Sequence, residues 1–161
     1  MKPIVLTSAA ELDAPPKLVW DVLTNWERQC DWMLEMSDIV VTSETREGVG
    51  VRARATIRIG GIRTTDLVRV DVWKPAEQLG MAHEGWVKGR GDMWLSSIGD
   101  DRTKLDWREE LHPPWGILGA VGLRAFRPLI RRTFLRDIAI LQNIVRFEAS
   151  RRYPGNNDAH S

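Results

Sequence analysis

Asp66, His83 and Glu109 are three ionisable residues that lie on three of the strands predicted from the sequence. Side chains along a strand alternate between two faces, so each of the three shares a face with apolar residues of its own strand. Those apolar residues are Val68, Val70 and Val72 for Asp66, Leu79 and Met81 for His83, and Leu105, Trp107 and Leu111 for Glu109. We therefore expect all three polar side chains to point toward the concave side of one sheet, unless a β-bulge changes the phase.

Charged groups in an apolar cavity are costly unless they pair with one another. A neutral imidazole beside a carboxylate could move a proton on an enolisable ketone or polarise a carbonyl group, which makes Glu109 and His83 the candidate catalytic residues. Two structural interpretations compete with this one. The three residues could form a buried cluster whose hydrogen bonds are all satisfied, or they could face water at the end of a sheet.

The other chemistry-bearing residues form no metal or cofactor motif. Three histidines are scattered along the chain without Cys or acidic residues at ligand spacing, so we expect no metal site and no cofactor. The Gly-rich residues 85–91 lack the Lys-Ser/Thr end of a phosphate-binding loop, and a hairpin with its turn at Lys88–Gly89 accounts for them. Cys30, the single cysteine, has no local signature of a nucleophile.

Strand-like alternation fills most of the first two thirds of the chain. The clearest example runs from Val51 to Ile59, and Gly60–Gly61 after it is a hairpin signal. Pro15 and Pro16 end the first strand and start a short helix, and a second short helical segment follows near residues 26–33. Short turns connect the strands, so we expect an antiparallel sheet. The predicted strands are 4–13, 39–44, 51–59, 62–73, 79–87, 91–98 and 103–111.

The last third of the chain predicts one long amphipathic helix, from about Ile117 to about Arg151. Pro128 lies inside it, so we expect a kink or a break near Arg124. A long apolar stripe needs a broad apolar partner, which only the curved sheet offers, and a bent sheet closed over one helix tends to leave a cavity. The stripe consists of Leu118, Val121, Ala125, Leu129, Phe134, Ile138, Leu141 and Val145.

The 161 residues predict a single domain over residues 1–152, followed by a disordered polar tail over residues 153–161. One cysteine allows no intrachain disulfide, which favours a reducing compartment. No apolar stretch is long enough to span a membrane, and the N-terminus lacks the long apolar run of a signal peptide. We therefore expect a cytoplasmic protein, either a monomer or a homodimer.

Charge is unevenly distributed along the chain. Residues 1–112 carry 15 Lys/Arg and 19 Asp/Glu, a net charge of −4, whereas residues 113–161 carry 8 Arg and 3 acids, a net charge of +5. This basic end could be the solvated back of an amphipathic helix, or it could contact an anionic membrane or a protein partner transiently. The run has no interleaved exposed aromatics, so we expect no nucleic acid partner. Its arginines are Arg124, Arg127, Arg131, Arg132 and Arg136.

Several motifs resemble one known superfamily. They are the Ala-Pro-Pro-x-x-Val-Trp opening within Leu12–Trp20, the Trp73–Pro75 turn, the Thr-x-x-x-Trp-x-Glu strand at residues 103–109, and the terminal helix. Together they resemble the START-like polyketide cyclase and lipid-transfer superfamily (SRPBCC) over nearly the whole chain. The resemblance implies an α+β helix-grip fold: a seven-stranded antiparallel curved sheet wrapped around a long C-terminal helix, with two short helices after the first strand. It also implies a cavity for an apolar ligand.

Members of that superfamily bind lipids or polyketides, or act as aromatases and cyclases, so the fold leaves three functions open. The first is a carrier or sensor that binds a hydrophobic small molecule, such as a lipid or polyketide, in the cavity. The second is a cyclase, aromatase or dehydratase, a lyase acting on a polyketide-like substrate through Glu109 and His83. The third is an adaptor that binds a protein or an anionic membrane through the arginine run. We favour the first, with these ligand contacts: Asp66, Val68, Val70, Met81, His83, Met93, Trp107, Glu109, Phe126, Leu129 and Phe134.

Overall fold

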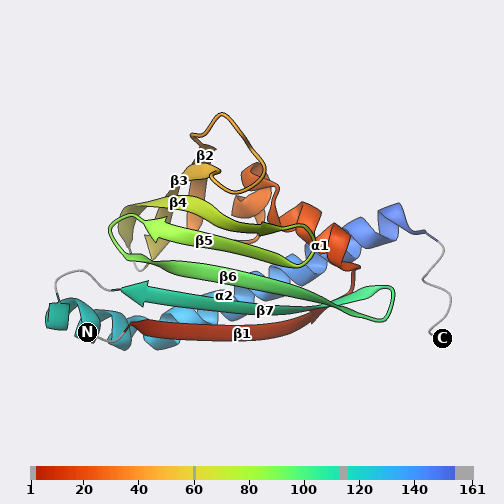
Figure 1. The fold of residues 1–161 in the computed structure, drawn as a ribbon. Helices are drawn as coiled ribbons and strands as arrows, with labels where there is room; N and C mark the ends of the chain where they lie inside the picture. Colours follow the sequence, from red (N-terminus) through yellow and green to blue (C-terminus); the bar gives the residue numbers. More distant parts are fainter. Residues whose placement is uncertain (1–2, 60, 113–115, 155–161) are drawn as a thin grey trace.

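The structure, a computed structural model, describes residues 3–59, 61–112 and 116–154. One seven-stranded antiparallel sheet with the strand order β1-β7-β6-β5-β4-β3-β2 dominates it, and the long helix α2 lies behind the sheet on one face (Figure 1). This is the helix-grip arrangement expected from the sequence. The strands are β1 (Ile4–Leu12), β2 (Met36–Val41), β3 (Arg52–Ile59), β4 (Ile62–Lys74), β5 (Gln78–Glu84), β6 (Lys88–Ile98) and β7 (Arg102–His112).

Alternation along β3 sets which face of the sheet is buried. Ala53 and Ala55 are almost fully buried, whereas Arg52 and Arg54 between them are exposed. The pairing of β4 with β5 shifts register between Val70 and Val72, where a β-bulge increases the local twist. Asp66 and His83 both lie on the same side of this bulge, so their side chains still point to the same face of the sheet, as predicted.

Two short helices follow β1, as predicted. Helix α1 (Pro16–Leu23) starts at a proline, which suits the first helical position because the missing N–H has no helical acceptor there. The second element is a 3₁₀ helix, η1 (Trp26–Asp31). Both pack their apolar residues into the main core.

Helix α2 (Gly116–Arg152) is continuous over 37 residues with Pro128 inside it, so the predicted break does not occur. Ile138, Leu141 and Val145 of the predicted stripe are buried and Phe134 is partly buried, whereas Ala125 is exposed. Leu129 is also exposed, with 42% of its surface accessible, while its neighbour Ile130 is buried. The inward face at this level therefore passes through Ile130.

The position of one turn and the start of one strand differ from the sequence prediction. The turn expected at Lys88–Gly89 lies instead at residues 85–87, and both glycines Gly89 and Gly91 belong to β6. Strand β2 starts at Met36, earlier than predicted. The polar tail falls outside the described residues from position 155 onward. Within the described part of the chain, no helix is both long enough and apolar enough to cross a bilayer.

Candidate functional site

Asp66, His83 and Glu109 form one hydrogen-bonded cluster across β4, β5 and β7. His83 Nδ1 lies 2.6 Å from Asp66 Oδ2, and His83 Nε2 lies 3.2 Å from Glu109 Oε2. The indole Nε1 of Trp107 donates to Glu109 Oε1 over 2.8 Å. Glu109 is buried, whereas His83 and Asp66 are partly buried. The strand phases predicted from the sequence thus bring the three side chains together.

His83 is the central group of this cluster, and its surroundings favour the charged ring. Burial lowers its pKa, but the hydrogen bonds to Asp66 and Glu109 and the two negative charges outweigh that effect and raise the pKa from 6.5 to about 10. Both ring nitrogens contact a carboxylate, so His83 is an imidazolium at neutral pH. The sequence predicts a neutral imidazole; a charged ring would instead act as a proton donor.

Glycines on β6 and after β5 make room for the cluster. A Cβ atom on Gly91 would lie 2.5 Å from Glu109 Oε1, because the Glu109 carboxyl group extends over this position toward His83. A Cβ atom on Gly85 would lie 2.8 Å from Asp66 Oδ1. Glycine at both positions leaves room for these carboxyl groups, and at Gly85 a Cβ atom would also meet the backbone of Thr65 and Asp66.

Aromatic side chains connect the cluster to helix α2. Trp107 packs edge-on against Phe134 with ring centroids 4.5 Å apart, and Trp32 packs edge-on against Trp107 at 6.0 Å. Trp32, directly after η1, is almost completely buried, yet its indole Nε1 has no hydrogen-bond partner among the described residues. A buried donor without a partner costs free energy, so this N–H is a place for an acceptor atom of a ligand.

The other predicted ligand contacts fall into three groups. Val70, Met81, Met93 and Trp107 are buried within the core, and Val68 and Phe134 are partly buried. Leu129 is largely exposed. The side chain of Phe126 lies outside the described residues.

Sequence reasoning missed Trp32 and Gly91 as parts of this site. Trp32 follows a 3₁₀ helix, where no periodic pattern assigns a direction to a side chain. Gly91 has no side chain to attract notice, and its role follows only from the register that places it opposite Glu109. Counting residues back from the hairpin turn between the last two strands would have placed Gly91 opposite the Trp-x-Glu strand, and no other sequence signal pointed to its role.

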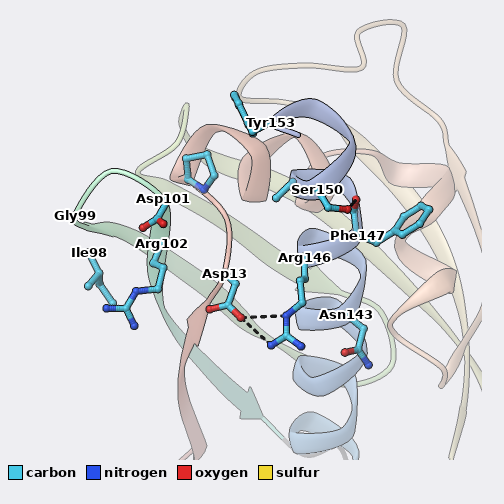
Figure 2. Close-up of a pocket in the computed structure, with 12 residues that line it drawn as sticks. Asp13, Ile98, Gly99, Asp101, Arg102, Asn143, Arg146, Phe147, Ser150 and Tyr153 are labelled. Carbon is cyan, nitrogen blue, oxygen red and sulfur yellow. Dashed lines mark hydrogen bonds and ion pairs between the residues drawn. The ribbon is translucent and has the colours of Figure 1, made fainter. Parts of the chain in front are cut away.

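Two of the surface hollows formed by the described residues lie against α2, one near its C-terminal end and one beside its middle. The larger, about 990 Å³, lies between the β6–β7 turn and the last turns of α2 (Figure 2). In Figure 2, Arg146 of α2 donates two hydrogen bonds to the carboxylate of Asp13 at this hollow. This end of the sheet is remote along β7 from Glu109, so the hollow is separate from the polar cluster.

The second hollow, about 720 Å³, lies between β1 and α2. It is lined by Thr7 and Ser8 on β1 and by Arg127, Arg131 and Phe134 on α2, among others. Since Phe134 also contacts Trp107, the inner wall of this groove adjoins the aromatic side chains described above.

The predicted arginine face is only partly free. Arg136 forms ion pairs with Glu35 and Asp137, so it links α2 to the η1–β2 loop. The side chain of Arg124 lies outside the described residues. Arg127, Arg131 and Arg132 are exposed. Within the described residues, no group of His, Cys, Asp or Glu side chains is arranged to hold a metal ion.

Comparison with known proteins gives both a family and a fold. A sequence profile described as "Polyketide cyclase / dehydrase and lipid transport" matches residues 12–138. Among curated proteins, no sequence matches this chain significantly.

Solved structures resemble the chain over most of its length. The Zhui aromatase/cyclase from Streptomyces sp. R1128 has 18% identity and a TM-score of 0.77, covering 95% of this chain and 98% of that protein. TTHA0849 from Thermus thermophilus has 17% identity and a TM-score of 0.78, covering 91% and 100%. A START superfamily protein from Mycobacterium smegmatis has 14% identity and a TM-score of 0.70, covering 88% and 97%. Similarities at these identities establish the helix-grip fold.

Proposed function

Because the chain belongs to the family of polyketide cyclases, dehydrases and lipid transport proteins, we propose that it binds a hydrophobic small molecule between the sheet and α2. The observation that supports this most is the Asp66–His83–Glu109 cluster, a polar group set among apolar and aromatic side chains of the sheet. Ligand sites of this class combine apolar walls with a few fixed polar groups that orient the ligand.

The polar groups of the site suggest what the ligand carries. Trp32 Nε1 is a buried donor that meets no acceptor in the described part of the chain, so it suits a carbonyl or other acceptor oxygen of a ligand. Trp32, Trp107 and Phe134 together form what we call the aromatic wall: Trp32 contacts Trp107 edge-on, and Trp107 contacts Phe134 of α2. A flat apolar molecule with one carbonyl group would satisfy both features.

A pair of probes that differ only in the carbonyl group tests this proposal. Native mass spectrometry first identifies any molecule that co-purifies. Quenching of tryptophan fluorescence then compares 9-fluorenone with fluorene, which lacks the oxygen. We expect Trp32→Phe to weaken fluorenone binding roughly threefold to tenfold and to leave fluorene binding unchanged, because one hydrogen bond is lost. Trp94→Phe, on a 37% exposed residue, is the matched control. Absence of binding by either probe and of any co-purifying apolar molecule would contradict the proposal.

Catalysis is the second candidate, and the 3.2 Å contact between His83 and Glu109 favours it. In a dehydration, a carboxylate would take the proton next to a carbonyl, the C–O bond would break, and the imidazolium would give its proton to the leaving hydroxide, which departs as water. A proton shift from the carboxyl group to the imidazole would restore the cluster.

The test uses the N-acetylcysteamine thioester of a 3-hydroxyacyl chain and measures loss of water by mass spectrometry. Glu109→Gln should abolish turnover while fluorenone still binds. Turnover that persists in this variant would show that Glu109 is not needed for the reaction. If the unchanged protein shows no turnover, the catalytic proposal fails and the binding proposal is unaffected.

A further inference from the structure

Three arginines on one segment of α2 have no acidic partner in the described structure. Arg127, Arg131 and Arg132 line the groove between β1 and α2, and none of them forms an ion pair with a described residue. By contrast, Arg136 and Arg146 on the same helix each pair with a carboxylate. Arginines clustered without acids repel one another, so an anion in the groove would relieve this repulsion.

The groove also offers polar groups from the sheet. Thr7 and Ser8 supply hydroxyl groups. Strand β1 lies at the edge of the sheet, with β7 as its single neighbour, so its outer edge carries main-chain N–H groups that no other strand in the described sheet engages. Arginine side chains, hydroxyls and main-chain N–H groups are the donors that bind carboxylates and phosphates in proteins.

The apolar part of the groove leads toward the interior. Val5, Leu6 and Phe134 line it, Leu6 is buried, and Phe134 packs against Trp107. Leu6 also lies opposite Glu109 in the β1–β7 pairing, so the groove and the polar cluster occupy the same level of the sheet. A ligand with an apolar body and an anionic end could therefore contact the aromatic wall and the arginines together.

From this arrangement we infer that the ligand of the proposed binding function is an anionic amphiphile, whose carboxylate or phosphate is held by Arg127, Arg131 and Arg132 at the β1–α2 groove. This inference rests on the proposed function and adds the charge of the ligand to it. The volume of the groove, about 720 Å³, is large enough for such an anionic group together with part of an alkyl chain.

Displacement of the neutral reporter N-phenyl-1-naphthylamine tests the inference with matched probes. Dodecanoate, dodecyl phosphate and dodecan-1-ol share one alkyl chain and differ in the head group, and all are used below their self-association concentrations. We expect at least one of the two anions to displace the reporter at about tenfold lower concentration than the alcohol, because the anion gains charge-assisted hydrogen bonds. Whichever anion is preferred identifies the head group as a carboxylate or a phosphate.

Arg131→Gln should reduce the preference for the anion over the alcohol to below about threefold and leave the concentration at which the alcohol displaces the reporter unchanged. Arg131→Lys should keep part of it, because the charge remains without the planar fork of donors. Arg54→Gln, on the exposed face of β3, is the matched control and should keep the full preference.

The outcomes separate the two proposals. Equal binding of alcohol and anions, or an anion preference that Arg131→Gln leaves intact, would overturn the anionic site while the apolar binding function stands. A protein that binds neither the reporter nor any of the three probes would overturn both.

Discussion

At the scale of single residues, His83 determines the electrostatics of the site. Its two nitrogens contact Asp66 and Glu109, so the cluster holds one positive and two negative charges in partly buried surroundings. A charge cluster of this kind is stable only while all partners keep their protonation states. The stability of the fold should therefore depend on pH through His83.

His83→Gln tests this dependence. The folded pKa of His83 is about 10 and the free value is 6.5, so its stabilising charge is fully present below pH 6.5 and is lost as pH rises toward 10. We expect the unchanged protein to have a higher unfolding free energy than the variant, with the largest difference near pH 6. Above pH 6 this difference should shrink by at most about 1.4 kcal/mol per pH unit. Urea denaturation at several pH values measures it, and a difference that stays constant with pH would contradict the assigned charge.

Gly91→Ala tests the packing of the Glu109 carboxyl group. The added methyl group would lie 2.5 Å from Glu109 Oε1, so the carboxyl group must shift within its hydrogen bonds to Trp107 and His83. We expect a loss of roughly 1–3 kcal/mol in unfolding free energy. In a Glu109→Ala background the same change should cost clearly less, because the clashing atoms are gone. Urea denaturation measures the loss of unfolding free energy in both backgrounds. Equal losses would show that the glycine is needed for the backbone conformation and not for the Glu109 side chain.

At the scale of elements, α2 is fixed to the rest of the molecule near its C-terminal end by a few polar contacts. Gln142 accepts a hydrogen bond from the main-chain N–H of Asp13 and donates one to its carboxylate, at 3.0 and 2.8 Å. Arg146 donates to the same carboxylate (Figure 2), but its side chain is 59% exposed. Solvent screens the second contact much more than the first.

Gln142→Ala and Arg146→Ala should therefore differ in cost. We expect about 1–2 kcal/mol for Gln142→Ala, because two partly buried hydrogen bonds are lost, and less than about 1 kcal/mol for Arg146→Ala, which loses an exposed ion pair. Added salt should change the cost of Arg146→Ala and leave the cost of Gln142→Ala unchanged. Chemical denaturation with and without salt gives both numbers, and a larger cost for Arg146→Ala would reverse this assignment.

The elements themselves were predictable because their periodicity is strong. Alternation in β3 and the proline at Pro16 indicated a strand and a helix start from local chemistry alone. The phases of Asp66, His83 and Glu109 were predictable for the same reason. The charge of His83 was not, because it depends on contacts between strands 17 and 26 residues apart in sequence. Likewise, the exposure of Leu129 follows from how α2 meets β1, which the spacing of apolar residues along one helix does not determine.

At the scale of the whole molecule, the two hollows along α2 differ in chemistry. Near the C-terminal end of α2, Arg146 and Arg152 pair with Asp13 and Asp21, whereas the groove near Arg131 is lined by arginines without acidic partners among the described residues. Three of the eight arginines of residues 113–161 therefore give the groove a local positive charge. Long-range attraction would raise the local concentration of anionic ligands there.

Ligand binding should consequently stabilise the folded chain, because the groove and the aromatic wall exist only when β1, β7 and α2 are assembled. At about 100 times its dissociation constant, a ligand specific for the folded state contributes about 2.7 kcal/mol. For a chain of this size, that corresponds to a rise of about 5–10 °C in the midpoint of thermal unfolding. We expect the preferred anionic dodecyl probe to produce this rise in the unchanged protein and in Arg54→Gln.

Arg131→Gln at the same probe concentration should show a much smaller rise, since less of the protein is bound, and added salt should reduce the rise in the unchanged protein as well. Differential scanning calorimetry measures the midpoints. If the reporter assay shows binding but the midpoint does not move, the probe binds the unfolded chain as well as the folded one. Such a result would mean that the alkyl chain, and not the assembled groove, supplies the affinity, because only a site that exists in the folded state can shift the unfolding equilibrium.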